Sequence, residues 1–298
     1  LHVPVGNDRG SAILTGQADF SWNTGLTVFN EAMKRRDIMR GVLLPVIGAV
    51  DWTFAVEKKP WSDSRVRQAI HLAIDRQAVI EVAKGAGSVF NLSRWMSPVS
   101  DYATPESETA KLPGYRPNKA DDIAEAKRLL AAAGYPDGFG PVDLVTTLPD
   151  PSSVLLQDQL KRSLNITVNI KSMERAAKNE VYSTRNFDIV QGTTIPLFSA
   201  PDPAPWWNLT IKTGGSLNYA RYSNPEFDKL LAQISAEGDF AKRKALVDQA
   251  MGVLDKDPPY FNFFAVHTPL WRPYVKGLNM EGRRFSEWRG LDLIWLDR

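Results

Sequence analysis

The stretch that decides the fold is PWSDSRVRQAIHLAIDRQAVIEVAKG, residues 60–85. After Asp63, apolar residues recur at every third and fourth position, which is the spacing of one helical face: Val66, Ala69, Ile70, Ala73 and Ile74. Asp75 precedes a second run of this kind, which Gly85 is expected to end. The other, polar side of the first run carries Arg65, Arg67, Gln68 and His71. The sequence therefore predicts two consecutive amphipathic helices, each capped by an aspartate.

The composition is ordinary for a soluble globular protein, with 43% hydrophobic and 23% charged residues. A chain of 298 residues is long enough for two domains, or one large one, with a substantial core. The net charge of +2 is too small to indicate binding to nucleic acid or an anionic membrane. Zero cysteines exclude structural disulfides and thiolate metal sites, and no apolar run is long enough to predict a membrane span.

The hydrophobic periodicity predicts an α/β protein around this helix pair. Helices are expected at 9–16, 27–36, 119–133, 151–163, 174–183, 224–236 and 239–255. Strands are expected at 142–147, 166–172, 187–191 and 260–266, with two more and a bend between 38 and 56. Residues 86–118 carry many prolines and glycines, which indicates a long surface connection. The alternation from 142 to 191 favours a mixed or parallel sheet.

Residues 63–80, DSRVRQAIHLAIDRQAVI, resemble the D-x-R-V-R-Q-A-hydrophobic-x-x-A-I-D-R segment of family 5 extracytoplasmic solute-binding proteins. These proteins are the peptide, nickel and related receptors of ABC importers. Three further stretches resemble the family in the same order: SAILTGQADFSWN (11–23), AEAKRLLAAAGYPDGF (124–139) and LNYARYSNPEFDKLLAQI (217–234). Four such stretches in order make a chance similarity improbable, and together they cover nearly the whole chain.

The resemblance implies an α/β, periplasmic-binding-protein-like fold of type II, cluster C, with two lobes. Residues 1–56 would form part of the first lobe and a hinge strand, 57–259 the C-terminal α/β lobe, and 260–298 strands returning to the hinge and first lobe. Family members are usually longer, and no signal peptide is recognisable at the start of this sequence. The resemblance therefore implies a C-terminal piece of a periplasmic or extracellular protein, and it leaves a lipid anchor open.

Several candidate ligand-binding residues lie where the family places its cleft. Trp22 and Asn23 follow a G-x-x-D element, and Trp95 lies in a loop from which it could stack on a ligand. Asp51 and Trp52 belong to the presumed hinge strand, where alternation sends Asp51 and Thr53 to one face and Trp52 to the other. The alternative for Trp22 is a core residue of a strand, and the alternative for Trp95 is a residue that pins its loop to the surface.

Further candidates follow the strand expected at 187–191. The residues at its carboxyl end lie at the usual ligand edge of an α/β sheet: Gln191, Gly192 and Thr193. The loop beyond contributes Phe198, Ser199 and Asp202, and the helix after it Trp206. Peptide-binding family members have an aspartate three residues before an acidic-Pro step, where it holds the peptide α-amino group. Here that step is Asp202–Pro203, and Ser199 stands in the anchor position.

Motifs of nucleophilic, zinc and nucleotide chemistry are absent from the sequence, and its three histidines, His2, His71 and His267, lie far apart. We therefore expect no enzyme activity, no cofactor and no metal. The favoured hypothesis is a monomeric receptor that binds a small solute or peptide between two lobes, delivers it to an ABC transporter permease and does not bind nucleic acid. The alternatives are a secreted hydrolase acting on saccharides or peptides, and a peptide chaperone or surface adhesin.

Overall fold

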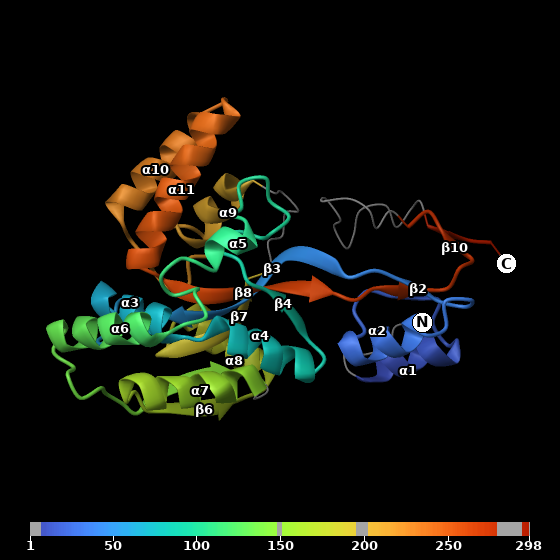
Figure 1. Cartoon of the computed structure of the whole chain (residues 1–298), viewed down its shortest axis with the longest axis horizontal. Coiled ribbons are helices and arrows are strands. Elements are labelled where there is room, and N and C mark those ends of the chain that lie inside the picture. The colour runs from blue at the N-terminus through green and yellow to red at the C-terminus, as the bar shows by residue number, and fades with distance from the viewer. Residues whose placement is uncertain (1–6, 148–150, 195–201, 279–293, 298) are drawn as a thin grey trace.

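The computed structural model describes residues 7–147, 151–194, 202–278 and 294–297. Its centre is a six-stranded sheet in the order β4-β8-β3-β7-β5-β6 (Figure 1). The strands are β4 (Val89–Asn91), β8 (Tyr260–His267), β3 (Leu44–Phe54), β7 (Ile189–Thr194), β5 (Val142–Thr146) and β6 (Val168–Ser172). The pairs β5–β6 and β5–β7 are parallel, whereas β3 pairs antiparallel with both β7 and β8. The predicted mixed sheet is confirmed.

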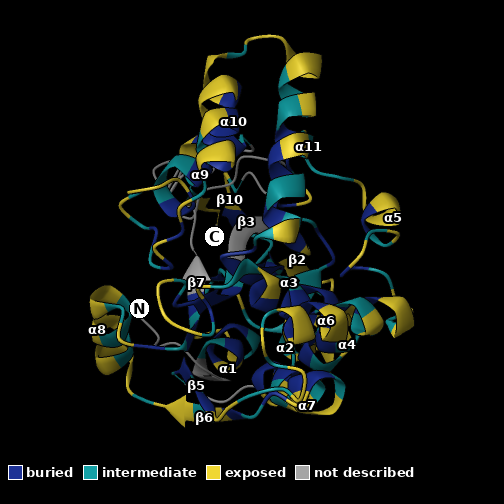
Figure 2. Cartoon of the chain, turned by 90° about the vertical axis from the view of Figure 1, so that its left-hand side faces the viewer, coloured by how far each residue is buried: buried dark blue, intermediate teal, exposed yellow. Residues whose placement is uncertain are grey.

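Helices cover both faces of this sheet (Figure 1). One face carries α3 (Ser64–Ala73), α4 (Arg76–Gly85), α6 (Ala120–Ala132) and α7 (Pro151–Leu164). The other face carries α9 (Pro203–Thr210), α10 (Pro225–Ala236) and α11 (Phe240–Lys256), while α8 (Arg175–Thr184) lies beside β7. The α10–α11 hairpin projects from the body with its outer sides exposed (Figure 2).

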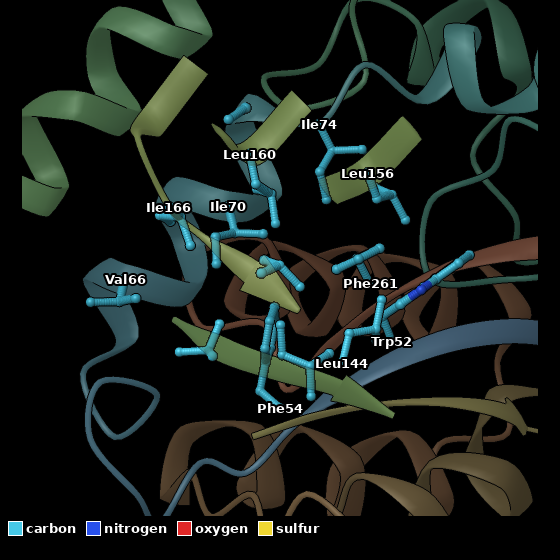
Figure 3. Close-up of a cluster of buried hydrophobic side chains, with 14 of the residues drawn as sticks. Trp52, Phe54, Val66, Ile70, Ile74, Leu144, Leu156, Leu160, Ile166 and Phe261 are labelled. Carbon is cyan, nitrogen blue, oxygen red and sulfur yellow. The ribbon is translucent and has the colours of Figure 1, made fainter. Parts of the chain in front are cut away.

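The largest core cluster fills the layer between the sheet and α3, α4, α6 and α7 (Figure 3). Trp52 and Phe54 point into it from β3, and the Trp52 ring stacks on Phe261 of β8 with 5.1 Å between centroids. Val66 and Ile70 of α3 pack against them. Because each large apolar side chain buried here stabilises the fold by roughly 1.5–3 kcal/mol, this face of β3 is committed to packing. Its opposite face is free to carry polar groups.

The two aspartate caps are confirmed. Asp63 accepts a hydrogen bond from the Arg65 backbone N–H at 2.9 Å, and Asp75 accepts one from Ala78 at 3.0 Å. The prediction that the second helix ends at Gly85 is confirmed, since Gly85 is the last residue of α4. The left-handed residue that follows the helix is Gly87, with φ 86°.

Residues 86–118 are more than a surface connection, which corrects the sequence-based expectation. They contain β4 and α5 (Glu106–Thr109), and Trp95 and Tyr115 are both buried. The Trp95 indole N–H donates to Asp255 of α11 at 2.7 Å, and its ring stacks on His71 of α3 with 5.7 Å between centroids. These partners, far away in the sequence, draw a proline-rich segment into the core.

A small module joins one end of the large sheet. Its three-stranded sheet has the order β1-β9-β2 and is covered by two helices. The elements are α1 (Asn7–Thr15), β1 (Phe20–Ser21), α2 (Leu26–Met33), β2 (Arg40–Gly41) and β9 (Leu270–Trp271). It has its own core of Ile13, Phe29, Ala32, Met39 and Leu270. Two short strands, β10 (Val275–Lys276) and β11 (Trp295–Leu296), pair nearby.

The chain passes twice between the small module and the large sheet, once from β2 into β3 and once from β8 into β9. The lobe boundaries expected at residues 56 and 260 stay a prediction. Both lie beside strands in the middle of the large sheet, β3 and β8. None of the helices in the described ranges is long and apolar enough to cross a membrane.

Candidate functional site

A polar cluster lies on the face of β3 that points away from the largest core. Asp51 and Thr53 share this face, and the Thr53 hydroxyl donates to the Asp51 carboxylate at 2.6 Å. Gly192 is the register partner of Asp51 on β7. A Cβ at Gly192 would lie 2.8 Å from the Tyr182 hydroxyl oxygen and 2.9 Å from Asp51 Oδ1. The absence of a side chain at position 192 therefore lets both groups approach the strand.

The remaining members of the polar cluster come from three other elements. Tyr182 and Lys178 lie one turn apart on α8, Tyr260 begins β8, and Tyr219 follows α9. The Tyr182 and Tyr219 ring centroids are 4.1 Å apart. Lys178 Nζ donates to the Gln191 backbone oxygen at 3.1 Å. The cluster thus joins the carboxyl end of β7 to the two strands that lead to the small module.

Burial and charge set the protonation of this cluster. Burial, helped by the negative charge of Asp51, raises the pKa of the Tyr182 and Tyr260 hydroxyls, so both remain donors near neutral pH. Burial lowers the pKa of the Lys178 ammonium, and the nearby cation Arg175 adds to that effect. Asp51 opposes it, because an anion favours the charged form of lysine.

The structure separates the two candidates of the hinge strand. Asp51 faces the polar cluster with only 1% of its surface exposed, whereas Trp52 faces the core and is equally buried. The Trp52 ring contacts Phe261 and Phe263 in the core, which favours a packing role, and its ligand contact stays a prediction. The alternation that predicted opposite faces for Asp51 and Trp52 is confirmed.

The other tryptophans divide in the same way. Trp95 is buried in a core cluster, which favours a packing role, and its ligand contact stays a prediction. In the adjacent pair on α9, Trp207 is fully buried, while Trp206 is partly buried at the edge of the same core cluster. A ligand contact of Trp206 stays a prediction.

Trp22 and Asn23 lie where the small module meets β8. The Trp22 ring meets His267 edge-on with 5.2 Å between centroids, and Asn23 Oδ1 accepts a hydrogen bond from the Thr268 hydroxyl at 2.8 Å. Burial lowers the pKa of His267 to about 4, so this imidazole is neutral at pH 7. Trp22 and Asn23 therefore belong to the joint between module and sheet, and their contact with a ligand stays a prediction.

The residues at the end of β7 have different surroundings. The Gln191 side chain accepts a hydrogen bond from the Thr146 hydroxyl of β5, whereas Gly192 faces the polar cluster. Thr193 pairs with Val50 in the sheet through its backbone. Phe198 and Ser199 lie outside the described residues, and so does the expected anchor position for a peptide amine.

Asp202 has a structural role. Its carboxylate caps α9 by accepting from the Ala204 backbone N–H at 2.9 Å, and it forms an ion pair with Arg243 of α11 at 2.8 Å. This carboxylate is therefore already bound at the start of the helix. Its expected contact with a ligand stays a prediction.

Sequence reasoning missed Lys178, Tyr182, Tyr219 and Tyr260. Two signals could have found part of this set. In YFNFF, strict alternation puts Tyr260 and Asn262 opposite the core residues Phe261 and Phe263. On the helix expected at 174–183, Lys178 and Tyr182 are four residues apart and therefore share a face.

The sequence motif of the helix pair, residues 63–80, lies outside the polar cluster, and two of its arginines are buried. Arg67 donates to the Pro258 backbone oxygen at 2.9 Å and to the Trp61 backbone oxygen, and it forms an ion pair with Asp257. Two residues of the expected polar side are in fact enclosed, with 4% exposure for Arg67 and 1% for His71, whereas Arg65 is exposed. The residues that follow α11 cover Arg67, and the 86–118 segment covers His71.

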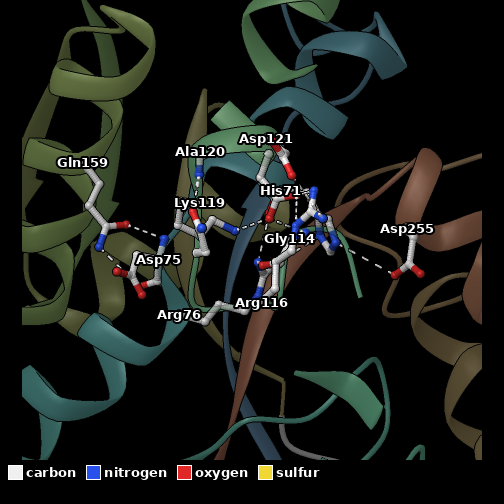
Figure 4. Close-up of polar contacts among 12 residues, drawn as sticks. His71, Asp75, Arg76, Gly114, Arg116, Lys119, Ala120, Asp121, Gln159 and Asp255 are labelled. Carbon is white, nitrogen blue, oxygen red and sulfur yellow. Dashed lines mark hydrogen bonds and ion pairs between the residues drawn. The ribbon is translucent and has the colours of Figure 1, made fainter. Parts of the chain in front are cut away.

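A second buried arginine organises the neighbouring loop (Figure 4). Arg76 donates to the backbone oxygens of His71, at 2.9 Å, and Gly114. Asp122 in turn accepts from the Gly114 backbone N–H at 2.9 Å and from Lys119 at 2.7 Å. These contacts hold α3, α4 and α6 to the loop, so the motif has a structural role. Across the described ranges, no cluster of acidic and histidine side chains could hold a metal ion.

Comparison with known proteins gives the family. Residues 2–216 match the bacterial extracellular solute-binding proteins, family 5 Middle. The periplasmic murein peptide-binding protein MppA of Escherichia coli K12 is 27% identical over 287 residues, which cover 92% of this chain and 51% of the relative. The periplasmic oligopeptide-binding protein OppA of Salmonella typhimurium is 25% identical, over 88% of this chain and 48% of its own length.

Solved structures share the fold. DppA from Helicobacter pylori, in complex with the peptide STSA, superposes with a TM-score of 0.79 at 20% identity, over 99% of this chain and 56% of that one. Escherichia coli MppA superposes with a TM-score of 0.76 at 24% identity, over 93% of this chain and 54% of that one. The chain spans about half the length of the curated relatives it matches. It belongs to the bacterial extracellular solute-binding proteins of family 5, as its sequence motifs predict, and it has the fold of their periplasmic binding proteins.

Proposed function

We propose that this chain contributes the ligand-binding site of an ABC importer's substrate-binding component, which captures a peptide-like solute and delivers it to a membrane permease. The observation that carries the proposal is the family match over residues 2–216. The relatives named above bind murein peptides and oligopeptides, and the Helicobacter pylori protein was solved with a peptide. The polar cluster with its tyrosines is a suitable surface for such a ligand, since binding sites combine aromatic walls with a few fixed polar groups.

The function requires two conformations and no covalent chemistry. A ligand shifts the balance between an open and a closed form only by the difference in its affinity for the two. The links from β2 to β3 and from β8 to β9 are the places where the small module can move relative to the large sheet. The polar cluster includes residues of β3 and β8, the two strands that continue into these links.

The class of solute that this chain binds can be tested directly. Other relatives are named for glutathione and, with the word probable, for deoxycholate, so family ligands extend beyond linear peptides. A receptor of this kind works outside the cytoplasmic membrane, and we place the protein in the periplasm or on the cell surface as a monomer without enzyme activity.

A thermal-shift screen of the whole protein tests the proposal. The panel contains di- to pentapeptides, glutathione, bile acids, opines, sugars and metal chelates, with N-acetylated, C-amidated peptides as matched controls. A ligand at 100 times its dissociation constant adds about 2.7 kcal/mol to the free energy of unfolding, which moves the Tm visibly. We expect a shift from the free peptides. No shift from any class, together with hydrolysis of a peptide or saccharide, would contradict the receptor and favour a hydrolase.

A further inference from the structure

The first turn of α2 is capped by the large body, which consists of the six-stranded sheet and its helices. Helix α2 begins at Leu26, and its N-cap, Gly25, has no side chain to accept from the free N–H groups of that turn. Instead, the Leu26 backbone N–H donates to the Gly87 backbone oxygen at 2.6 Å. Gly87 follows α4, whose end lies beside the small module (Figure 1). One hydrogen bond therefore joins the module directly to the large body.

The surroundings of this hydrogen bond allow it to open. A Cβ at Gly25 would lie 3.3 Å from the Gly87 oxygen, and the φ of Gly25 is 79°, so a glycine lets the two backbones approach. Gly87 is only half-buried, so water can replace Leu26 when the module moves away. A net backbone hydrogen bond shifts an equilibrium by about tenfold or less. The contact can therefore favour one arrangement without fixing it.

The contacts at Thr268, in the link from β8 to β9, are of another kind. The Thr24 backbone N–H donates to the Thr268 hydroxyl at 3.2 Å, and the Thr24 hydroxyl donates to the Thr268 backbone oxygen at 3.0 Å. Asn23 Oδ1 accepts from the Thr268 hydroxyl at 2.8 Å and from its backbone N–H at 3.3 Å. Thr268 is buried, with 1% exposure. Several hydrogen bonds shielded from water thus hold the loop before α2 to the link.

We propose that the Leu26–Gly87 hydrogen bond is a latch, which breaks and re-forms as the small module turns about the link at Thr268. The inference rests on the proposed function and deepens it, because it assigns one breakable contact to the motion that such a receptor requires. A ligand opens or closes the latch only if its affinities for the two arrangements differ by more than the latch contributes, about tenfold.

A reversible cross-link across the latch tests the proposal, and the chain has no cysteine that would compete. A Cβ at Gly87 would lie 3.6 Å from the Thr27 hydroxyl oxygen, so the double variant Thr27→Cys, Gly87→Cys is expected to form a disulfide on oxidation with diamide. Stopped-flow tryptophan fluorescence then follows the binding and release of Ser-Thr-Ser-Ala by the whole protein, before and after reduction with dithiothreitol.

We expect exchange of the peptide to be at least about tenfold slower in the oxidised double variant than in the reduced one. The two single variants and wild type, treated with the same reagents, should show no difference between oxidised and reduced samples. Equal rates in a double variant that is fully cross-linked would overturn the latch and leave the receptor standing.

A second measurement needs no ligand, so it decides the case in which no peptide binds or the double variant does not fold. Amide hydrogen exchange of wild type compares the Leu26 and Thr268 N–H groups by mass spectrometry with residue-level fragmentation. If the latch opens while the link stays intact, Leu26 exchanges at least about tenfold faster than Thr268, after correction for intrinsic rates. Equal protection would mean that both contacts open together, which contradicts a latch.

Discussion

The helix pair α3–α4 and the polar cluster on β3, β7 and β8 both bury charged groups, but for different purposes. In the helix pair, Arg67 and Arg76 are surrounded by backbone oxygens and held by near neighbours in the fold. In the polar cluster, Lys178 of α8 donates to one neutral acceptor near the end of β7, and the charge of Asp51 favours its ammonium form. The first arrangement is saturated and rigid. The second is the surface that we propose for the solute, and the helix-pair motif of residues 63–80 lies in the first.

The largest expected effect separates two arginines of the same motif. Arg67→Met leaves the Trp61 and Pro258 oxygens without their donor and Asp257 without its partner, so we expect a loss of about 3–5 kcal/mol. Arg65→Met removes an exposed ion pair with Asp63 and should cost about 1 kcal/mol or less. Urea unfolding measures both. Equal losses would show that the motif does not act through burial.

Acid should destabilise the joint at the end of β8. The folded-state pKa of His267 is about 4, below its ordinary value of 6.5, because burial disfavours the imidazolium. The unfolded chain therefore takes up a proton first as the pH falls, so stability is complete above pH 6.5 and is lost between 6.5 and about 4. Between pH 7 and 5 this group removes about 1–2 kcal/mol.

His267→Gln should reduce that loss without abolishing it, because burial and nearby cations also lower the pKa of His71. Urea unfolding at pH 7, 6 and 5 measures the difference. An unchanged pH dependence in His267→Gln would mean that the imidazole at the joint is solvated, and that acid acts on the helix pair alone.

The smallest effect on stability belongs to the polar cluster. Gly192→Ala places a methyl group against the Tyr182 hydroxyl and Asp51, two side-chain ends that can shift, so we expect a loss of about 1 kcal/mol. Gly238→Ala is the matched control, because nothing lies within 4 Å of its Cβ position. If Gly192→Ala unfolded the protein as strongly as Arg67→Met, the polar cluster would be a structural element of the same kind as the motif.

Local signals in the sequence predicted much of the fold. Asp63 and Asp75 were recognisable as caps, and the periodicity from 142 to 191 gave the parallel part of the sheet, since both depend on neighbours in the chain. The burial of Arg67 and His71 could not be predicted, because the elements that cover them come from residues far along the chain. The sequence of a polar helix face is the same whether water or another helix such as α11 lies against that face.

The candidate site was predictable only in part, for the same reason. Alternation placed Asp51 and Trp52 on opposite faces correctly, but not which face the core would cover. Lys178 and Tyr219 meet Asp51 and Tyr182 only after α8 and the segment following α9 have packed beside β7. Such a site is assembled from β3, β7, β8, α8 and the segment after α9, and no single stretch of sequence contains it.

The most direct test of the account is a calorimetric titration of a peptide that binds wild type into Gly192→Ala and Gly238→Ala, both shown to be folded. If the polar cluster is the ligand surface, Gly192→Ala binds about tenfold more weakly or not at all, while Gly238→Ala binds as wild type does. Wild-type affinity in folded Gly192→Ala would contradict the assignment of the ligand site to this face of the sheet.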